Sequence, residues 1–562
     1  MKKNAKRKAI LGTAVILLAA SLIFVPRMVS QQNPSLEITD LEPLQVDQRE
    51  GHPKLEYLLF KLMEKAERDG IPAARDFAFQ REIDMDGDNI RVVLEADYQG
   101  LAGQARTAAG LVKRQVESLG GRVETSHNHK VQSMVPLSSL MNFVLLPTVK
   151  YVRLPIKPMT FDVTSEGVAV TGADQWHALP GYRSPTPAKI CILDAGFKDY
   201  EALLGTDLPA SVTARSFRAD GNIYASKHGT ACAEIVHDMA PDAQLWLVNS
   251  GTMVEMENAI DWIIEQGVQI ISYSMGSYTG GAGDGTGPFC ECVKTAADAG
   301  ITYVISAGNG ASDHWRGTFN DPDNDGWHNF SGGDEILKFN VSAYYIVSAQ
   351  MKWNDWGTWT GVDYTGSNQD YDLYLYIWTG SSWTYVTKSS NTQTGSQWPT
   401  EYISGWYSNS ARDWGIAIKK KNANRRVIFD VWIPTHNGNL EYRSTSRSLA
   451  TPGDSPRGVT VAAVHWQNDI LEPYSSQGPT ADNRVKPDIA APSVVSCNAY
   501  GSQGFNGTSA ACPHVAGAFG LLLGKTPYNL DQIKAILEGR VKELGPSGKD
   551  NQFGKGRLKL TR

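Results

Sequence analysis

Short, largely apolar runs that alternate with helical stretches constrain the fold of this chain more than any other feature. The runs lie at 188–193, 243–248, 268–273 and 301–305, and helices are predicted at 229–238, 254–265 and 288–299. Because the runs are apolar on both sides, both faces of the sheet that they form must be covered. Strands joined by helices pair in parallel. The pattern therefore predicts an α/β domain with a doubly wound, mostly parallel sheet, with its site at the carboxyl ends of the strands.

A segment of different composition interrupts this alternation between about 311 and 451. It holds 11 of the chain's 15 Trp residues, together with many Tyr, Thr and Ser. Period-two runs such as 371–377 and 426–432 predict strands of an antiparallel sandwich. The α/β pattern then resumes with a strand at 458–464 and helices at 513–523 and 531–538. We therefore expect an inserted all-β domain, whose aromatic side chains form its core or, alternatively, an exposed patch that binds a polysaccharide or a protein.

The N-terminal part has two features of its own. Five basic residues between positions 2 and 8 precede an apolar run from Ala9 to Val25, which predicts an export signal over residues 1–31. The run is near the lower limit for spanning a bilayer, so a cleaved signal peptide and an uncleaved membrane anchor both remain open. Residues 89–158 show an α+β pattern, with a strand near 90–96 and a helix near 104–118.

Composition excludes several classes of protein. The net charge of -6, without a long basic stretch beyond the N-terminus, argues against nucleic-acid binding. The six cysteines are too few and too scattered for a disulfide scaffold. We expect Cys191, Cys232 and Cys512 to be buried free thiols, and leave one disulfide among the others open.

The stretch 505–517 has the features of a segment that presents a nucleophilic serine. Gly507 permits a tight turn, and Ser509 would lie at the start of a helix, where backbone N–H groups favour negative charge. Small residues follow, and Pro513 is expected in the first turn of that helix. Taken alone, the stretch also fits a buried helix rich in Ala and Gly.

A serine hydroxyl needs a histidine base and a carboxylate that orients the histidine. Asp194 ends the predicted strand 188–193, and His228 precedes a run of small residues at a helix start. Each also has an ordinary structural explanation, as a turn former and as a hydrogen-bonded core histidine. Asn309 follows the strand 301–305 between two glycines, where it fits either a turn or an amide donor to an oxyanion.

These stretches resemble the motifs of the subtilisin-like serine proteases, in the family's order Asp194, His228, Ser509. The resemblance implies that Asn309 is the oxyanion-hole asparagine and that Ser274, Met275 and Gly276 bind the substrate backbone as an added strand. It covers about 163–310 and 452–562. Asn309 and Ser509 lie 200 positions apart, and the inserted domain accounts for the excess over the family's usual spacing.

The resemblance also gives a domain organisation. Residues 1–31 are the signal peptide or anchor, 32–160 the propeptide region, 161–310 and 452–562 the two parts of the catalytic domain, and 311–451 an inserted sandwich that resembles a jelly roll. The segments 117–123, 135–136 and 149–153 resemble the family's propeptide, which templates folding and then blocks the active site until it is cut. The alternative is a generic ferredoxin-like module, a fold with many functions.

A short acidic run near the start of the insert suggests a structural cation site. Asp321, Asp323 and Asp325 alternate with other residues and are followed by Gly326, a pattern that can surround Ca²⁺. The acidic twelfth position of an EF-hand is missing, so the alternative is a solvated turn. The chemistry itself would need no cofactor.

The sequence thus predicts an exported serine endopeptidase that is made as a zymogen. We expect a monomer that acts on proteins or peptides outside the cell or at the outer face of the cytoplasmic membrane, with its own propeptide as a partner and no nucleic acid. The alternative is a catalytically silent surface protein that binds a ligand through the β-sandwich.

Overall fold

The structure, a computed structural model, describes residues 51–79, 81, 83–98, 102–156, 165–177, 187–434 and 439–561. Residues 51–562 form one compact unit. None of the helices in the described ranges is long and apolar enough to cross a bilayer, and the predicted signal or anchor at 1–31 lies outside these ranges.

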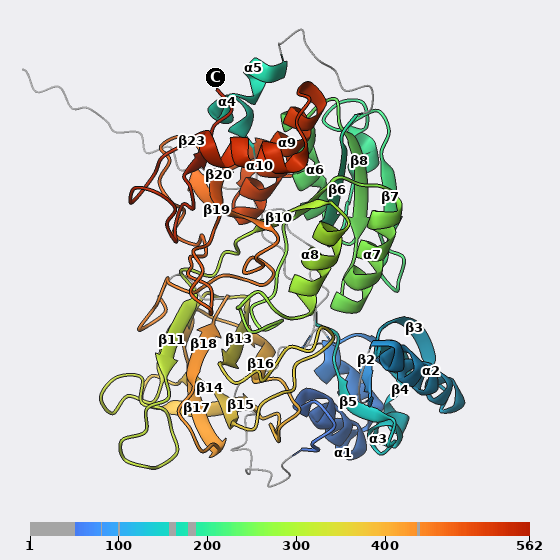
Figure 1. The fold of residues 1–562 in the computed structure, drawn as a ribbon. Helices are drawn as coiled ribbons and strands as arrows, with labels where there is room; N and C mark the ends of the chain where they lie inside the picture. Colours follow the sequence, from blue (N-terminus) through green and yellow to red (C-terminus); the bar gives the residue numbers. More distant parts are fainter. Residues whose placement is uncertain are drawn as a thin grey trace, which may run out of the picture. The chain divides into compact units, whose positions relative to one another are not determined.

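A nine-stranded sheet carries the α/β part, in the order β23-β24-β20-β19-β10-β9-β6-β8-β7 (Figure 1). All neighbours from β24 to β7 are parallel, and only β23 is antiparallel to its neighbour. The strands are β6 (Lys189–Asp194), β7 (Thr213–Ser216), β8 (Gln244–Asn249), β9 (Ile270–Tyr273), β10 (Thr302–Ser306), β19 (Val459–His465), β20 (Ile489–Ser493), β23 (Val541–Lys542) and β24 (Arg557–Leu558). The predicted doubly wound sheet is confirmed.

Helices cover both faces of this sheet, which explains why its strands are apolar on both sides. Ile190 and Ile192 of β6 pack in a core with α6 (His228–Met239) and α9 (Thr508–Lys525). Cys191 and Leu193 point the other way, into a second core with α7 (Met253–Glu265) and α8 (Pro288–Asp298). The shorter helices of this part are α4 (Gly167–Thr171), α5 (Ala173–His177), α10 (Leu530–Gly539) and the 3-10 turn Tyr200–Leu203.

The inserted domain is a sandwich of two antiparallel four-stranded sheets. Their orders are β11-β18-β13-β16 and β12-β17-β14-β15. The strands are β11 (His314–Thr318), β12 (Leu337–Val341), β13 (Tyr345–Trp353), β14 (Asp370–Trp378), β15 (Trp383–Ser389), β16 (Thr400–Ser408), β17 (Arg412–Asn422) and β18 (Ile428–Trp432). Trp315, Trp353 and Trp414 are buried between the sheets, as expected for aromatic side chains that form a core.

The N-terminal module contains the predicted α+β unit and extends beyond it, because Leu59 and Leu62 of a preceding helix pack in the same core. Its sheet has the order β1-β2-β4-β3, and β5 pairs with β2. The strands are β1 (Met85–Asp86), β2 (Asn89–Ala96), β3 (Arg122–His127), β4 (Lys130–Pro136) and β5 (Val149–Arg153), with the helices α1 (Tyr57–Phe79), α2 (Ala102–Ser118) and α3 (Leu140–Val144) and the 3-10 turn Leu137–Ser139. Gly70 interrupts α1 with a φ of 86°, a value that glycine adopts without strain.

Candidate active site

The predicted catalytic residues come from four elements of the α/β part. Asp194 is the last residue of β6, His228 the first of α6, Ser509 the second of α9, and Asn309 follows β10. Asp194, His228 and Ser509 are almost fully buried. Since parallel strands end at one edge of the sheet, this topology brings distant positions of the chain to a common edge.

Asp194 and His228 form a direct pair. Nδ1 of His228 lies 2.8 Å from Oδ1 and 2.9 Å from Oδ2 of Asp194, and the N–H of Ala195 also donates to Oδ1 over 2.7 Å. With Nδ1–H donating to the carboxylate, Nε2 of the imidazole is the atom that can take a proton. A side chain at position 229 would approach Cβ of Asp194 to 2.8 Å, so Gly229 permits the close approach of α6 to β6.

Ser509 is held by reciprocal bonds with the segment after β9. Its hydroxyl donates to the carbonyl of Ser274 over 3.0 Å, and the hydroxyl of Ser274 donates to the carbonyl of Ser509, also over 3.0 Å. Cys232 belongs to α6, and its side chain faces α9. Its Sγ lies 4.0 Å from Nδ1 of His228 and 3.8 Å from the carbonyl oxygen of Ser509. The base and the serine therefore belong to neighbouring helices.

The start of α9 differs from the prediction. The helix begins at Thr508, five residues before Pro513, which we expected in the first turn. Proline has no N–H, so Pro513 leaves the carbonyl of Ser509 without its helical donor. Ser274 and Cys232 supply donors to this carbonyl instead, which explains how a proline is accommodated inside the helix.

Asn309 is oriented by the residue that precedes the serine. Its Oδ1 accepts from the backbone N–H and from the hydroxyl of Thr508, both over 2.9 Å, and the N–H of Gly308 donates to that hydroxyl over 3.1 Å. The NH₂ group of Asn309 is thus the end directed away from Thr508. An amide donor aimed at an oxyanion typically contributes about 10²–10³ to kcat, a value taken from subtilisin.

The predicted substrate-binding residues 274–276 lie directly beside this site. Ser274 contacts Ser509, Met275 is buried in the core beneath α7 and α8, and the Cα of Gly276 faces the carbonyl of Thr451. A side chain at Gly276 would come within 2.9 Å of that carbonyl. The segment is therefore held by Ser509 at one end and packed against Thr451 at the other.

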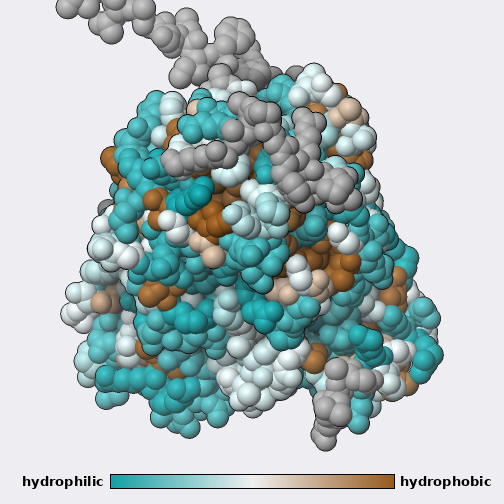
Figure 2. Space-filling view, turned by 45° about the horizontal axis from the view of Figure 1, so that its top comes forward, coloured by the Kyte–Doolittle hydropathy of each residue, from teal (hydrophilic) through white to brown (hydrophobic). Residues whose placement is uncertain are grey.

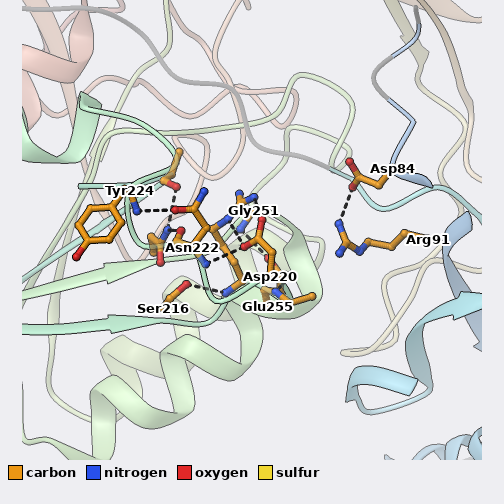
Figure 3. A network of polar contacts seen from close by, with 12 residues as sticks. Asp84, Arg91, Ser216, Asp220, Asn222, Tyr224, Gly251 and Glu255 are labelled. Atoms are coloured by element: carbon orange, nitrogen blue, oxygen red, sulfur yellow. Dashed lines mark hydrogen bonds and ion pairs between the residues drawn. The ribbon is translucent and has the colours of Figure 1, made fainter. Parts of the chain in front are cut away.

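Glu255 of α7 holds two backbone segments, one after β8 and one after β7. Its carboxylate accepts from the N–H of Gly251 over 2.7 Å and from the N–H of Ala219 over 2.8 Å (Figure 3). Figure 3 also shows Asp220 and Asn222 in the adjoining loop, where the N–H of Asn222 donates to Asp220. The sequence did not reveal this role, because a Glu in the first turn of a helix is usual on electrostatic grounds alone.

Comparison with known proteins decides the family. Residues 187–556 match the model of the subtilase family, Peptidase_S8. The chain belongs to the subtilase family. The inserted domain at 311–451 lies within this matched range.

Similar proteins include two from Bacillus. Subtilisin amylosacchariticus of Bacillus subtilis subsp. amylosacchariticus is 30% identical over 147 residues, which are 26% of this chain and 37% of that protein. Serine protease AprX of Bacillus subtilis (strain 168) is 36% identical over 117 residues, or 16% of this chain and 26% of that protein. The matches thus span little more than a third of the first of these relatives.

Among solved structures, the CspB protease of Clostridium perfringens has a TM-score of 0.46 at 16% identity. The match covers 71% of this chain and 98% of that one.

The six cysteines of this subtilase, all in described residues, are free thiols. Burial raises the pKa of Cys232 well above its usual value, with Asp194 adding to the shift. Asp194, His228 and Cys232 lie close enough to hold a metal, but the thiol is not ionised and the first two side chains bond one another. Cys232 therefore lies beside the Asp194–His228 pair as a neutral thiol.

The acidic run of the insert forms a cluster in the subtilase. Carboxylate oxygens of Asp321, Asp323 and Asp325 lie within 4.8 Å of one another. Oδ1 of Asp321 is buried without a hydrogen-bond partner, while its Oδ2 lies 3.1 Å from Nζ of Lys420. An unpartnered carboxylate oxygen beside two further carboxylates fits a hard cation such as Ca²⁺.

Proposed function

We propose that this subtilase is a serine endopeptidase that is exported and made as a zymogen. The observation that carries the proposal is the bond between Asp194 and Nδ1 of His228 at the edge where α9 presents Ser509. The arrangement supplies the nucleophile, the base and the orienting carboxylate that acyl transfer needs. Proteins or peptides are the proposed substrates, and the enzyme is proposed to act as a monomer without nucleic acid.

The proposed mechanism follows from the donors around Ser509. The hydroxyl turns from the carbonyl of Ser274 to Nε2 of His228, which takes its proton as Oγ attacks the scissile carbonyl. The backbone N–H of Ser509 and the NH₂ of Asn309 then hold the oxyanion. His228 returns the proton to the leaving amine, and water releases the acyl-enzyme. A substrate strand laid along 274–276 would present its carbonyl to Ser509.

The N-terminal module is the proposed propeptide, because it packs on α7 beside the site. Nζ of Lys130 lies 2.5 Å from Oε1 of Glu257, and Gln132 donates to Glu255 over 3.2 Å. Just after the last strand of the module in the sequence, the carbonyl of Ile156 accepts from the N–H of Met253 over 3.1 Å. The chain therefore passes the start of α7 just before the undescribed residues 157–164, and we propose cleavage in that connection.

The rival function is a silent surface protein that binds through the sandwich. Four exposed tyrosines give it some support, all beside or within β13 and β16: Tyr344, Tyr345, Tyr402 and Tyr407. On the face shown in Figure 2, however, apolar side chains form separate areas among hydrophilic ones. Nothing in the rival function requires the Asp194–His228 pair.

A fluorophosphonate probe distinguishes the two functions. Such probes phosphonylate a serine only where a neighbouring base activates it. We expect the purified, matured protein to be labelled and to lose its hydrolysis of casein in proportion to labelling. A folded protein that neither takes up the probe nor cleaves casein would be a silent scaffold, and the proposed function would be wrong.

We further propose that Asp321, Asp323 and Asp325 bind Ca²⁺ as a structural ion. The expected result is that millimolar Ca²⁺ raises the Tm of the insert by about 5 °C relative to a chelator, since ligand binding to the folded state alone stabilises it. Calorimetry of the full chain measures this shift. Asp323→Asn should abolish it, and equal Tm values with Ca²⁺ and with a chelator would contradict the proposal.

A further inference from the structure

One loop of the inserted sandwich contacts both other parts of the molecule through adjacent side chains. Asp363 and Tyr364 lie between β13 and β14, and both are buried. Asp363 faces the N-terminal module, whereas Tyr364 contacts the α/β domain. The loop therefore connects the proposed propeptide to the catalytic domain without belonging to either.

Asp363 is the centre of the contact with the N-terminal module. Its Oδ2 lies 3.0 Å from Nζ of Lys150 in β5 and 3.7 Å from Nε2 of His129. Its Oδ1 accepts from Nε1 of Trp398 over 2.9 Å. Burial alone would raise the pKa of Asp363, but Lys150 and His129 hold it below its usual value, so the carboxylate stays charged. A buried charge of this kind depends on its partners across the contact.

Tyr364 holds the loop that follows the predicted substrate-binding residues 274–276. Its hydroxyl accepts from the N–H of Ala282 over 3.1 Å and lies 2.9 Å from Oγ1 of Thr286. Lys352 of β13 adds a bond from Nζ to the carbonyl of Gly281 over 3.0 Å. The insert thus fixes a loop of the catalytic domain with one side chain and the N-terminal module with the next.

Further contacts extend the surface between the insert and the module. The N–H of Tyr57 donates to Oδ1 of Asn391 over 2.7 Å, and Gln397 donates to the carbonyl of Pro53 over 2.9 Å. The guanidinium of Arg81 lies 4.8 Å from the ring centre of Trp406. A small cavity is lined by His127 of the module, Glu257 and Pro288 of the catalytic domain, and Trp359 and Val362 of the insert.

We propose that the inserted sandwich is a second binding site for the propeptide, centred on Asp363. The partner that it fits is the N-terminal module of this chain, residues 51–156, after cleavage of the connection that follows. The module would then be held by α7 through Lys130 and Gln132 and by the insert through Lys150, so that it stays bound and inhibitory after cleavage. This inference rests on the proposed zymogen function.

Hydrogen exchange of the full chain tests the docking without requiring activity. We compare Ser509→Ala with Ser509→Ala carrying Asp363→Asn, which removes the charge and keeps the shape. We expect amide exchange in β5 to become about tenfold faster or more, because Lys150 loses its buried partner. Lys150→Met should give the same increase, and the double variant no more than either single variant.

The matched control is Asp413→Asn, which breaks an ion pair with Lys338 (2.8 Å) inside the insert. Exchange in β5 should not change in this variant. If Asp363→Asn and Lys150→Met both left β5 exchanging as in the control, the insert would not be a binding site for the module. If Asp363→Asn unfolded the insert, Lys150→Met alone would decide, since Lys150 belongs to the module.

A second readout uses the active chain. After self-cleavage, the module should co-elute with the enzyme in gel filtration, and Asp363→Asn should release it and shorten the lag before full activity about tenfold. Release at the same rate in both proteins would overturn the inference. A wild-type chain that never cleaves itself would instead contradict the proposed function, while the exchange data would still report on docking.

Discussion

Replacing Ser509 by alanine should reduce hydrolysis of casein by roughly 10⁶ and leave the chain uncleaved between the N-terminal module and the catalytic domain. The change removes the nucleophile and leaves the oxyanion donors and the substrate segment in place, so peptide binding should persist. An activity assay measures the first effect, and gel electrophoresis of the expressed protein measures the second.

A serine that lies elsewhere supplies the control. Ser381 is exposed in the turn between β14 and β15, and Ser381→Ala should mature and hydrolyse casein like the wild type. If Ser509→Ala also matured and kept its activity, Ser509 would not be the nucleophile, and the account of the site would be wrong.

Asp194→Asn should lower kcat by about 10⁴ and change KM little. The asparagine fits the same space, but only one of its two terminal atoms accepts a hydrogen bond. With its oxygen bonded to the N–H of Ala195, its NH₂ group faces Nδ1 of His228, which needs an acceptor. The imidazole would then lose the tautomer and the orientation in which Nε2 takes the proton of Ser509. Steady-state kinetics on a peptide substrate measure both constants.

Thermal unfolding of Asp194→Asn serves as the check on folding, because Asp194 is fully buried. A folded variant within tenfold of the wild-type kcat would show that the carboxylate does not orient the base. The larger expected loss in Ser509→Ala reflects the difference between losing the nucleophile and losing the group that aligns its base.

Much of the fold followed from patterns that are local in the sequence. The apolar strands 188–193 and 243–248 predicted β6 and β8, because strands covered on both faces cannot alternate in polarity. The break in composition after position 310 predicted the sandwich. Part of the candidate site also followed from local patterns, since Gly229 and Gly517 leave room for close packing against Asp194 and Met239.

Other features depend on contacts between distant residues and had no signal in the sequence. Pro513 suggested the first turn of α9, but the helix starts at Thr508. The carbonyl of Ser509, to which Pro513 cannot donate, accepts instead from Ser274, 235 positions earlier, and from Cys232. The pair Lys150–Asp363 joins residues 213 positions apart, and no pattern in the sequence indicates that they meet. Only the folded chain shows that the insert contacts both other parts.

The central claim is that Ser509 is activated by the Asp194–His228 pair. Mass-spectrometric mapping of a fluorophosphonate adduct tests it most directly, because it identifies the modified residue as well as the loss of activity. We predict a single adduct on the peptide that contains Ser509, and none in His228→Ala. An active protein that carries the adduct on another serine, or an adduct on Ser509 that persists in His228→Ala, would contradict the claim.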